Sequence, residues 1–84
     1  MIYKYTLDTV TKLEVSKYHQ ILSLQAQFNQ PVIWIDSDPR QEQTTITITA
    51  AQTGSESPGG IYLGSIQLDD DTYVLHFYAK ISTA

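Results

Sequence analysis

The sequence contains no cysteine, so neither disulfide bonds nor thiolate metal sites can brace the fold. Its two histidines, His19 and His76, stand far apart in the chain, and a structural zinc site is therefore not expected. A length of 84 residues favours one domain spanning residues 1–84. Because a domain of this size buries only a modest core, we expect a homo-oligomer, either a dimer or a tetramer.

Basic residues are also few, since five Lys and Arg face nine Asp and Glu for a net charge of −4. The five basic residues are scattered, so duplex nucleic acid and anionic membrane surfaces are not expected as partners. No apolar run exceeds four residues, which predicts no membrane span. The first residues enter a strand pattern directly and lack a signal-peptide core, so a soluble cytoplasmic protein is the simplest expectation.

What the sequence does contain is alternation of apolar and polar residues. Period-two patterns occupy residues 2–7, 44–50 and 72–82, and shorter strand patterns occupy 13–15 and 61–68. Gly64 interrupts the last of these, which is typical of a β-bulge or a close backbone approach. Turn clusters separate the segments, and no helix is predicted. The pattern predicts an all-β fold, a small antiparallel β-sandwich or barrel of about seven strands.

The most regular stretch is 21–38, which predicts a β-hairpin. One predicted face of its first strand carries Leu22, Leu24, Ala26 and Phe28. Asn29-Gln30-Pro31 predicts the turn, and a β-branched, aromatic strand follows at 32–35. That strand holds the only tryptophan, Trp34. Two interpretations of Trp34 stay open: a core side chain, or a stacking platform for a nucleobase helped by Arg40.

Three strands carry polar second faces: Ser23/Gln25/Gln27, Thr45/Thr47/Thr49 and His76/Tyr78/Lys80. If these strands are neighbours in one sheet, they form a wall rich in hydrogen-bonding groups and nearly free of carboxylates. The wall would bind a polar ligand or a second subunit, or would be an ordinary solvated face. The segment 52–60 is rich in Gly, Ser and Pro and longer than a hairpin needs. It is either a functional loop or a mobile connector.

Motifs for catalysis are missing. The chain has no G-x-S-x-G, no P-loop and no G-x-G-x-x-G. Asp36 and Asp38 would form a carboxylate pair, but a strand-end turn explains them equally well. The acidic run 69–71 is expected to be a turn. We therefore predict no enzyme activity, no catalytic residues, no metal and no cofactor.

The order of several short segments resembles a family of small phage-encoded proteins. The matching segments are I-Y-K-Y-T-L at 2–7, I-L-S-L-Q-A-Q at 21–27, P-V-I-W at 31–34 with Asp38-Pro39, Y-L-G-S-I-Q at 62–67 and V-L-H-F-Y at 74–78. This family is similar to phage anti-CBASS proteins that act as sponges for cyclic dinucleotides such as 3′3′-cGAMP. The glycine-rich segment 53–60 departs from the family pattern because it lacks a histidine, which puts its ligand specificity in doubt.

The resemblance implies an immune-evasion protein of the host cytoplasm that sequesters a cyclic nucleotide signal without cleaving it and so inhibits CBASS. Such a ligand needs aromatic rings for its bases, cations for its phosphates and amides for its base edges. The residues that we predict to bind it are Lys4, Tyr5, Gln25, Trp34, Arg40, His76 and Tyr78. Lys80 is a further cation suited to phosphate. The alternative is a non-catalytic phage structural or accessory protein that binds another protein through its polar sheet face.

Overall fold

The computed structural model describes residues 1–69 and 72–82 and divides them into seven strands. They are β1 (Ile2–Thr6), β2 (Val10–Ser16), β3 (Gln20–Gln27), β4 (Gln30–Asp36), β5 (Gln43–Gln52), β6 (Ile61–Leu68) and β7 (Tyr73–Ser82). All pairings are antiparallel, and none of the described residues is helical. The predicted all-β class is confirmed. Across the same residues, no helix is long and apolar enough to cross a membrane.

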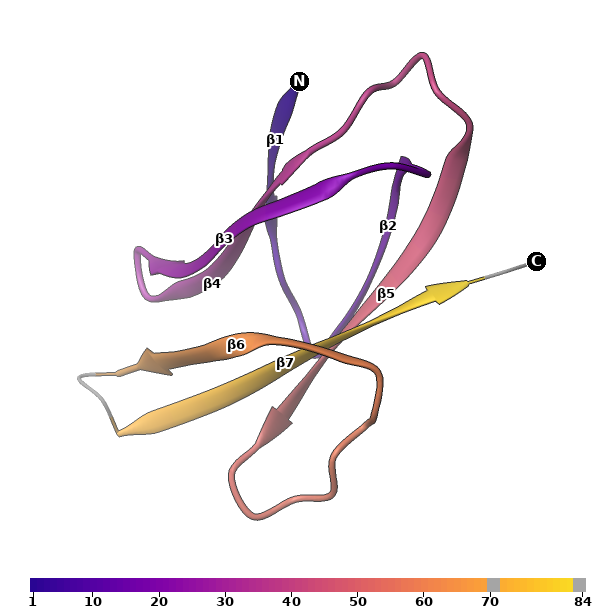
Figure 1. Cartoon of the computed structure of the whole chain (residues 1–84). Helices are drawn as coiled ribbons and strands as arrows, with labels where there is room; N and C mark the ends of the chain where they lie inside the picture. Colours follow the sequence, from indigo (N-terminus) through magenta and orange to yellow (C-terminus); the bar gives the residue numbers. More distant parts are fainter. Residues whose placement is uncertain (70–71, 83–84) are drawn as a thin grey trace.

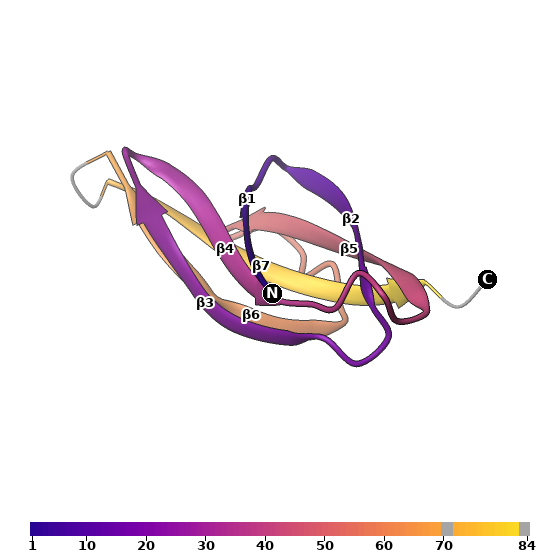
Figure 2. The ribbon, with the colours of Figure 1, turned by 90° about the horizontal axis from the view of Figure 1, so that it is seen from above.

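The strands form two sheets that pack as a sandwich. One sheet has three strands in the order β1-β4-β3, and the other has four in the order β2-β5-β7-β6 (Figure 1). Because β1 and β2 are consecutive but belong to different sheets, the chain crosses between the layers at their connection (Figure 2). The hairpins β3–β4 and β6–β7 each stay within one sheet.

The core lies between the sheets and follows the predicted alternation. Ile33 and Ile35 of β4 and Ile46 and Ile48 of β5 are buried, while Trp34 and Thr47 between them face outward. Phe77 of β7 is the largest fully buried side chain. These residues belong to one cluster with members from both sheets. Each sheet therefore has an inner face in this core and an outer face that points away from the other sheet.

β-Bulges change which side chains face inward in two strands. The register of β3 shifts between Ile21 and Ser23, so Ile21 and Leu24 both pack on the core. The predicted apolar face is therefore right for Leu24 but wrong for Leu22, which is 44% exposed, and for Phe28, which is 91% exposed in the turn. In β6 the register shifts between Tyr62 and Gly64, which confirms the bulge predicted at Gly64.

Polar links join the two sheets at the two ends of β4. At one end, the Asn29 side chain donates to Asp69 Oδ1 at 2.7 Å and accepts from the Asp69 backbone N–H at 2.9 Å. Asp69 lies in the acidic run predicted as a turn, whose residues 70 and 71 lie outside the described residues. At the other end, the backbone N–H of Ser16 donates to Ser37 Oγ at 2.8 Å, and the N–H of Asp38 donates to Ser16 Oγ at 3.1 Å.

The serine link predicts a stability effect. Ser16 is fully buried, and its hydroxyl is the acceptor for the Asp38 N–H and lies 3.2 Å from Ser37 Oγ. Ser16→Ala removes that acceptor inside the fold, so we expect a loss of about 1–3 kcal/mol in the free energy of unfolding, measured by urea denaturation. The control is Ser55→Ala, which removes an exposed hydroxyl and should change it by less than about 0.5 kcal/mol. Equal effects of the two substitutions would contradict the assigned role of the link.

The three polar strand faces do not form one wall. β5 and β7 are neighbours, so the threonines of β5 and the outward residues of β7 share one outer face. β3 belongs to the other sheet, and its Ser23 and Gln25 lie on the outer face of that sheet. The expectation of a single wall is therefore wrong for β3, because alternation predicts which face a residue occupies but not which strands are neighbours.

Candidate functional site

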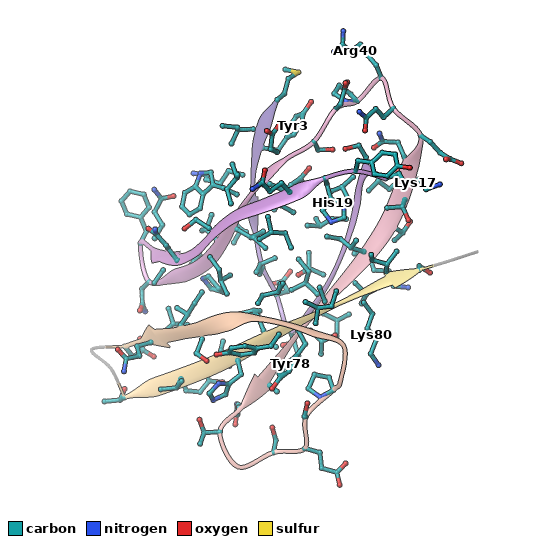
Figure 3. All side chains as sticks on the ribbon, in the orientation of Figure 1. Tyr3, Lys17, His19, Arg40, Tyr78 and Lys80 are labelled. Atoms are coloured by element: carbon teal, nitrogen blue, oxygen red, sulfur yellow. The ribbon has the colours of Figure 1, made fainter. Side chains whose placement is uncertain are left out.

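Each outward residue in the middle of β7 meets the segment that connects β5 to β6. We call this segment, residues 53–60, the glycine loop. His76, Tyr78 and Lys80 alternate with the buried Phe77 and Ala79, so all three lie on the outer face of the four-stranded sheet. Figure 3 shows Tyr78 and Lys80 on this strand, beside the loop. Because the loop folds back over β7, these side chains and the loop form one continuous surface.

His76 connects the glycine loop to the sheet. Its Nε2 lies 2.8 Å from Oγ1 of Thr53 in the loop, and its Nδ1 lies 2.7 Å from Oγ of Ser65 on β6. A neutral imidazole donates at one nitrogen and accepts at the other, and both hydroxyls can rotate to match either tautomer. The Ser65 hydroxyl also hydrogen-bonds to the Tyr62 hydroxyl. His76 is thus fixed by side chains from the loop and from the neighbouring strand.

An aromatic pair lies next to this histidine. Tyr62 of β6 faces Tyr78 of β7 across the ladder, with ring centroids 5.4 Å apart and planes tilted by 56°. Tyr62 is 55% exposed, so part of the pair is open to a ligand. Tyr78 and His76 also line a hollow of about 230 Å³ together with the glycine loop. Pockets that enclose a drug-sized ligand measure about 300–1,000 Å³, so one subunit would enclose only part of such a ligand.

Lys80 lies against the two glycines at the end of the loop. A Cβ on Gly60 would lie 2.8 Å from Lys80 Cγ and 2.6 Å from the carbonyl oxygen of Ala79, so the loop backbone touches β7 here. A Cβ on Gly59 would lie 3.8 Å from Lys80 Nζ. At position 60 only glycine allows this approach, whereas a Cβ at position 59 would make an ordinary contact. The Lys80 stem therefore packs on the loop, and its ammonium group stays at the surface.

Three of the predicted ligand residues lie on the other outer face. Lys4 of β1 and Ser23 of β3 are the register partners of Trp34 in β4. Gln25 is in the next row of the same face and donates to Ser23 Oγ at 2.9 Å. Trp34 is half-buried on this surface rather than inside the core. The Lys4 ammonium donates to Gln27 Oε1 at 3.1 Å.

Tyr5 and Arg40 are separate from both outer faces. Tyr5 points inward, packs on the core and lies near Tyr3, with ring centroids 6.4 Å apart. Burial, and to a smaller extent the neighbouring Tyr3, raises the pKa of the Tyr5 phenol above its usual value. The Arg40 guanidinium donates to both carboxylate oxygens of Asp38, at 3.0 and 3.2 Å. These bonds hold the pKa of Asp38 below its usual range and occupy the guanidinium.

The predicted ligand residues therefore fall into separate groups. His76 and Tyr78 lie together beside the glycine loop, Lys4, Gln25 and Trp34 lie together on the three-stranded sheet, and Tyr5 and Arg40 join neither group. Within one chain the two groups cannot contact one ligand, since the outer faces of a sandwich point away from each other.

Sequence reasoning missed Thr53, Tyr62 and Ser65, which complete the surface around His76 and Tyr78. Tyr62 and Ser65 face outward together only because the bulge in β6 adds a residue between them and restores the alternation. Gly64 is the sequence feature that predicts this bulge, but it does not predict that β6 pairs with β7. Nothing in the sequence indicates that Thr53 reaches His76.

The chemistry of this surface suits binding. In a nucleophilic triad a carboxylate orients the histidine, whereas His76 has a hydroxyl at each ring nitrogen. In the part of the chain that the structure describes, no three His, Cys, Asp or Glu residues are grouped as metal ligands would be. Hydroxyls, an imidazole, two phenols and an ammonium can instead donate to and stack on a polar, anionic ligand.

Comparison with known proteins gives a family but no characterised relative. Neither the curated proteins nor the solved structures contain a match to this chain. A family model described as a domain of unknown function, DUF7352, matches residues 1–84. The chain therefore belongs to the DUF7352 family over its whole length.

Proposed function

We propose that the protein is a non-catalytic sponge that binds a cyclic nucleotide signal such as 3′3′-cGAMP. In this proposal it is a phage immune-evasion protein that acts in the host cytoplasm and inhibits CBASS by keeping the intact signal bound. The observation that carries the proposal is the meeting of His76, Tyr78 and Lys80 with the glycine loop.

The chemistry of this surface supports the proposal. A base can stack on the Tyr62–Tyr78 pair, which by analogy with single-strand binding contributes about 1–3 kcal/mol for each base. The Lys80 ammonium is suited to a phosphate beside the loop. The hydroxyls of Thr53 and Ser65 add donors and acceptors. Both ring nitrogens of His76 meet hydroxyls, so no carboxylate orients the imidazole as in a nucleophilic triad, which favours sequestration over cleavage.

The size of the hollow supports a homo-oligomer as part of the proposal. At about 230 Å³, the hollow beside the glycine loop falls below the range that encloses a drug-sized ligand. A second copy of the chain related by two-fold symmetry would place an identical surface opposite the first. A cyclic dinucleotide has a matching pseudo-two-fold shape, so a dimer, or a tetramer made of two dimers, would enclose it.

Native mass spectrometry of the purified protein with a mixture of cyclic dinucleotides tests this function. We expect an oligomer that carries a ligand, and denaturation should release that ligand intact. Calorimetry should then show that Tyr78→Ala weakens binding by about 5- to 150-fold through lost stacking. The matched control is Lys4→Gln on the other outer face, which should bind as the parent protein does.

Three results would count against the proposal. Cleaved ligand would indicate an enzyme. Absence of binding across the panel would exclude the sponge. Loss of binding in Lys4→Gln but not in Tyr78→Ala would move the site to the three-stranded sheet. In that last case the fluorescence of Trp34, the only tryptophan, should respond to the ligand.

The second candidate function is binding of another protein. Exposed apolar side chains favour it, above all Phe28, which is 91% exposed at the tip of the β3–β4 hairpin. Under this alternative, purification from infected cells recovers a protein partner that Phe28→Ala releases. If Phe28→Ala retains every recovered partner, this role for the hairpin tip is wrong.

A further inference from the structure

A second lysine faces the same surface as Lys80. Lys12 of β2 pairs with Thr47 of β5, and Thr47 pairs with Lys80 of β7. The three residues therefore form one row across the outer face of the four-stranded sheet, which we call the lysine row. Neighbouring strands are about 4.7–4.9 Å apart, so the backbones of the two lysines are separated by about 10 Å. The Lys80 stem packs against Gly60 with its ammonium group beside Gly59, so this group has to turn from the loop to reach a phosphate over Thr47.

Neither ammonium group of the lysine row is neutralised by the described residues. The cations that do have a carboxylate within ion-pair distance are the Met1 ammonium beside Asp36, Lys17, which lies 3.8 Å from Glu42, and Arg40, which is bound by Asp38. Within residues 1–69 and 72–82, no carboxylate lies within ion-pair distance of Lys12 or Lys80. Both lysines are exposed. In an acidic protein, two unpaired lysines on one face form a local positive charge.

The surroundings of the row add donors and few opposing charges. Thr45, Thr47 and Thr49 point their hydroxyls to the same face, where no described group hydrogen-bonds to them. Glu14, on β2 in the next row, is the carboxylate that shares this sheet face. Glu56, the one acidic residue of the glycine loop, is exposed. The row of Tyr78 and Tyr62 lies on the side away from Glu14.

We propose that Lys12 and Lys80 together bind the phosphate groups of the ligand across Thr47. This inference rests on the proposed function for the identity of the ligand, and it names the phosphate-binding residues of the same surface. A ligand with two phosphates places one near each ammonium group, and the Thr47 hydroxyl donates between them. The bases then extend along the neighbouring row toward the tyrosine pair. Lys12 becomes a ligand residue that family resemblance did not indicate, and Lys4 and Arg40 are not required.

The test uses two probes, inorganic pyrophosphate and 3′3′-cGAMP, titrated into isotope-labelled protein and followed by NMR of the backbone amides. We expect both probes to shift the amide signals of the lysine row. Lys12→Gln and Lys80→Gln should each weaken the binding of both probes by about tenfold or more, since a charge-assisted hydrogen bond is lost. The matched control is Lys17→Gln, whose ammonium already has Glu42 beside it. This variant should bind both probes as the parent protein does.

The two probes separate this inference from the proposed function. If pyrophosphate binds at the lysine row and 3′3′-cGAMP does not bind, the phosphate site stands and the sponge proposal fails. If 3′3′-cGAMP binds equally well to Lys12→Gln and the parent protein, the inference is overturned and the sponge proposal stands. Binding of neither probe overturns both. Loss of binding in Lys17→Gln but not in Lys12→Gln or Lys80→Gln overturns the inference alone, because it places the phosphate contact away from the lysine row.

Discussion

Phe77→Ala is expected to lower the free energy of unfolding by about 3–5 kcal/mol, the largest effect of any single truncation in this fold. Phe77 is fully buried and lies in the middle of the four-stranded sheet. Its partners across the ladder are Ala50 on β5 and Gly64 on β6, two small residues that leave room for the ring. Alanine at position 77 would make three small residues adjacent, and no neighbour could fill the cavity.

The measurement is urea denaturation of the parent protein and of Phe77→Ala, and the matched control variant is Phe28→Ala. Phe28 is 91% exposed in the turn between β3 and β4, so the same chemical change there should alter stability by less than about 0.5 kcal/mol. A small domain has a total stability in the range of about 5–15 kcal/mol, so Phe77→Ala should bring the protein close to unfolding. A loss below about 1 kcal/mol would show that the sheets close around the smaller side chain.

Gly60→Ala is expected to lower the free energy of unfolding by about 2–5 kcal/mol. This loss is the sum of backbone strain and steric overlap with β7. Gly60 has φ +97°, a conformation that alanine adopts only with strain. The new Cβ would also lie 2.6 Å from the Ala79 carbonyl oxygen, which is backbone and cannot rotate away. The loop would have to move from β7, and the Lys80 stem would lose its support.

Gly54→Ala is the matched control, because Gly54 has nearly the same dihedral, φ +93°, with no atom within 4 Å of an added Cβ. It carries the strain without the overlap, so the difference between the two variants measures the close approach. We expect Gly60→Ala to be less stable than Gly54→Ala by about 1–3 kcal/mol in urea denaturation. Equal losses would mean that the loop end shifts freely and does not position Lys80.

The sequence predicts the faces of several strands well and their neighbours poorly. Alternation along β7 correctly separates the buried Phe77 and Ala79 from the outward His76 and Tyr78. The same rule fails at the start of β3, where the bulge between Ile21 and Ser23 leaves Leu22 exposed while Ile21 and Leu24 both pack on the core. Period two carries no information on register between strands, because that depends on contacts distant in the chain.

The candidate site was predictable only in part, for the same reason. The sequence suggests Arg40 as a phosphate partner, but Asp38, two residues before it, accepts two hydrogen bonds from its guanidinium. The sequence pattern predicts a strand only from Leu13, whereas β2 begins at Val10, so the pattern gives Lys12 no place on a sheet face. Its place opposite Thr47 follows from the pairing of β2 with β5, which no local pattern predicts.

The two bulges also have a consequence for how copies of this protein can assemble. β3 and β6 are edge strands, one in each sheet, and each carries a bulge that interrupts its ladder. A bulged edge is a poor template for another strand, which is a common protection against uncontrolled sheet growth and fibre formation. A sheet that continues from one subunit into the next would have to begin at the regular edges β1 or β2. Contact through the outer faces leaves those edges free.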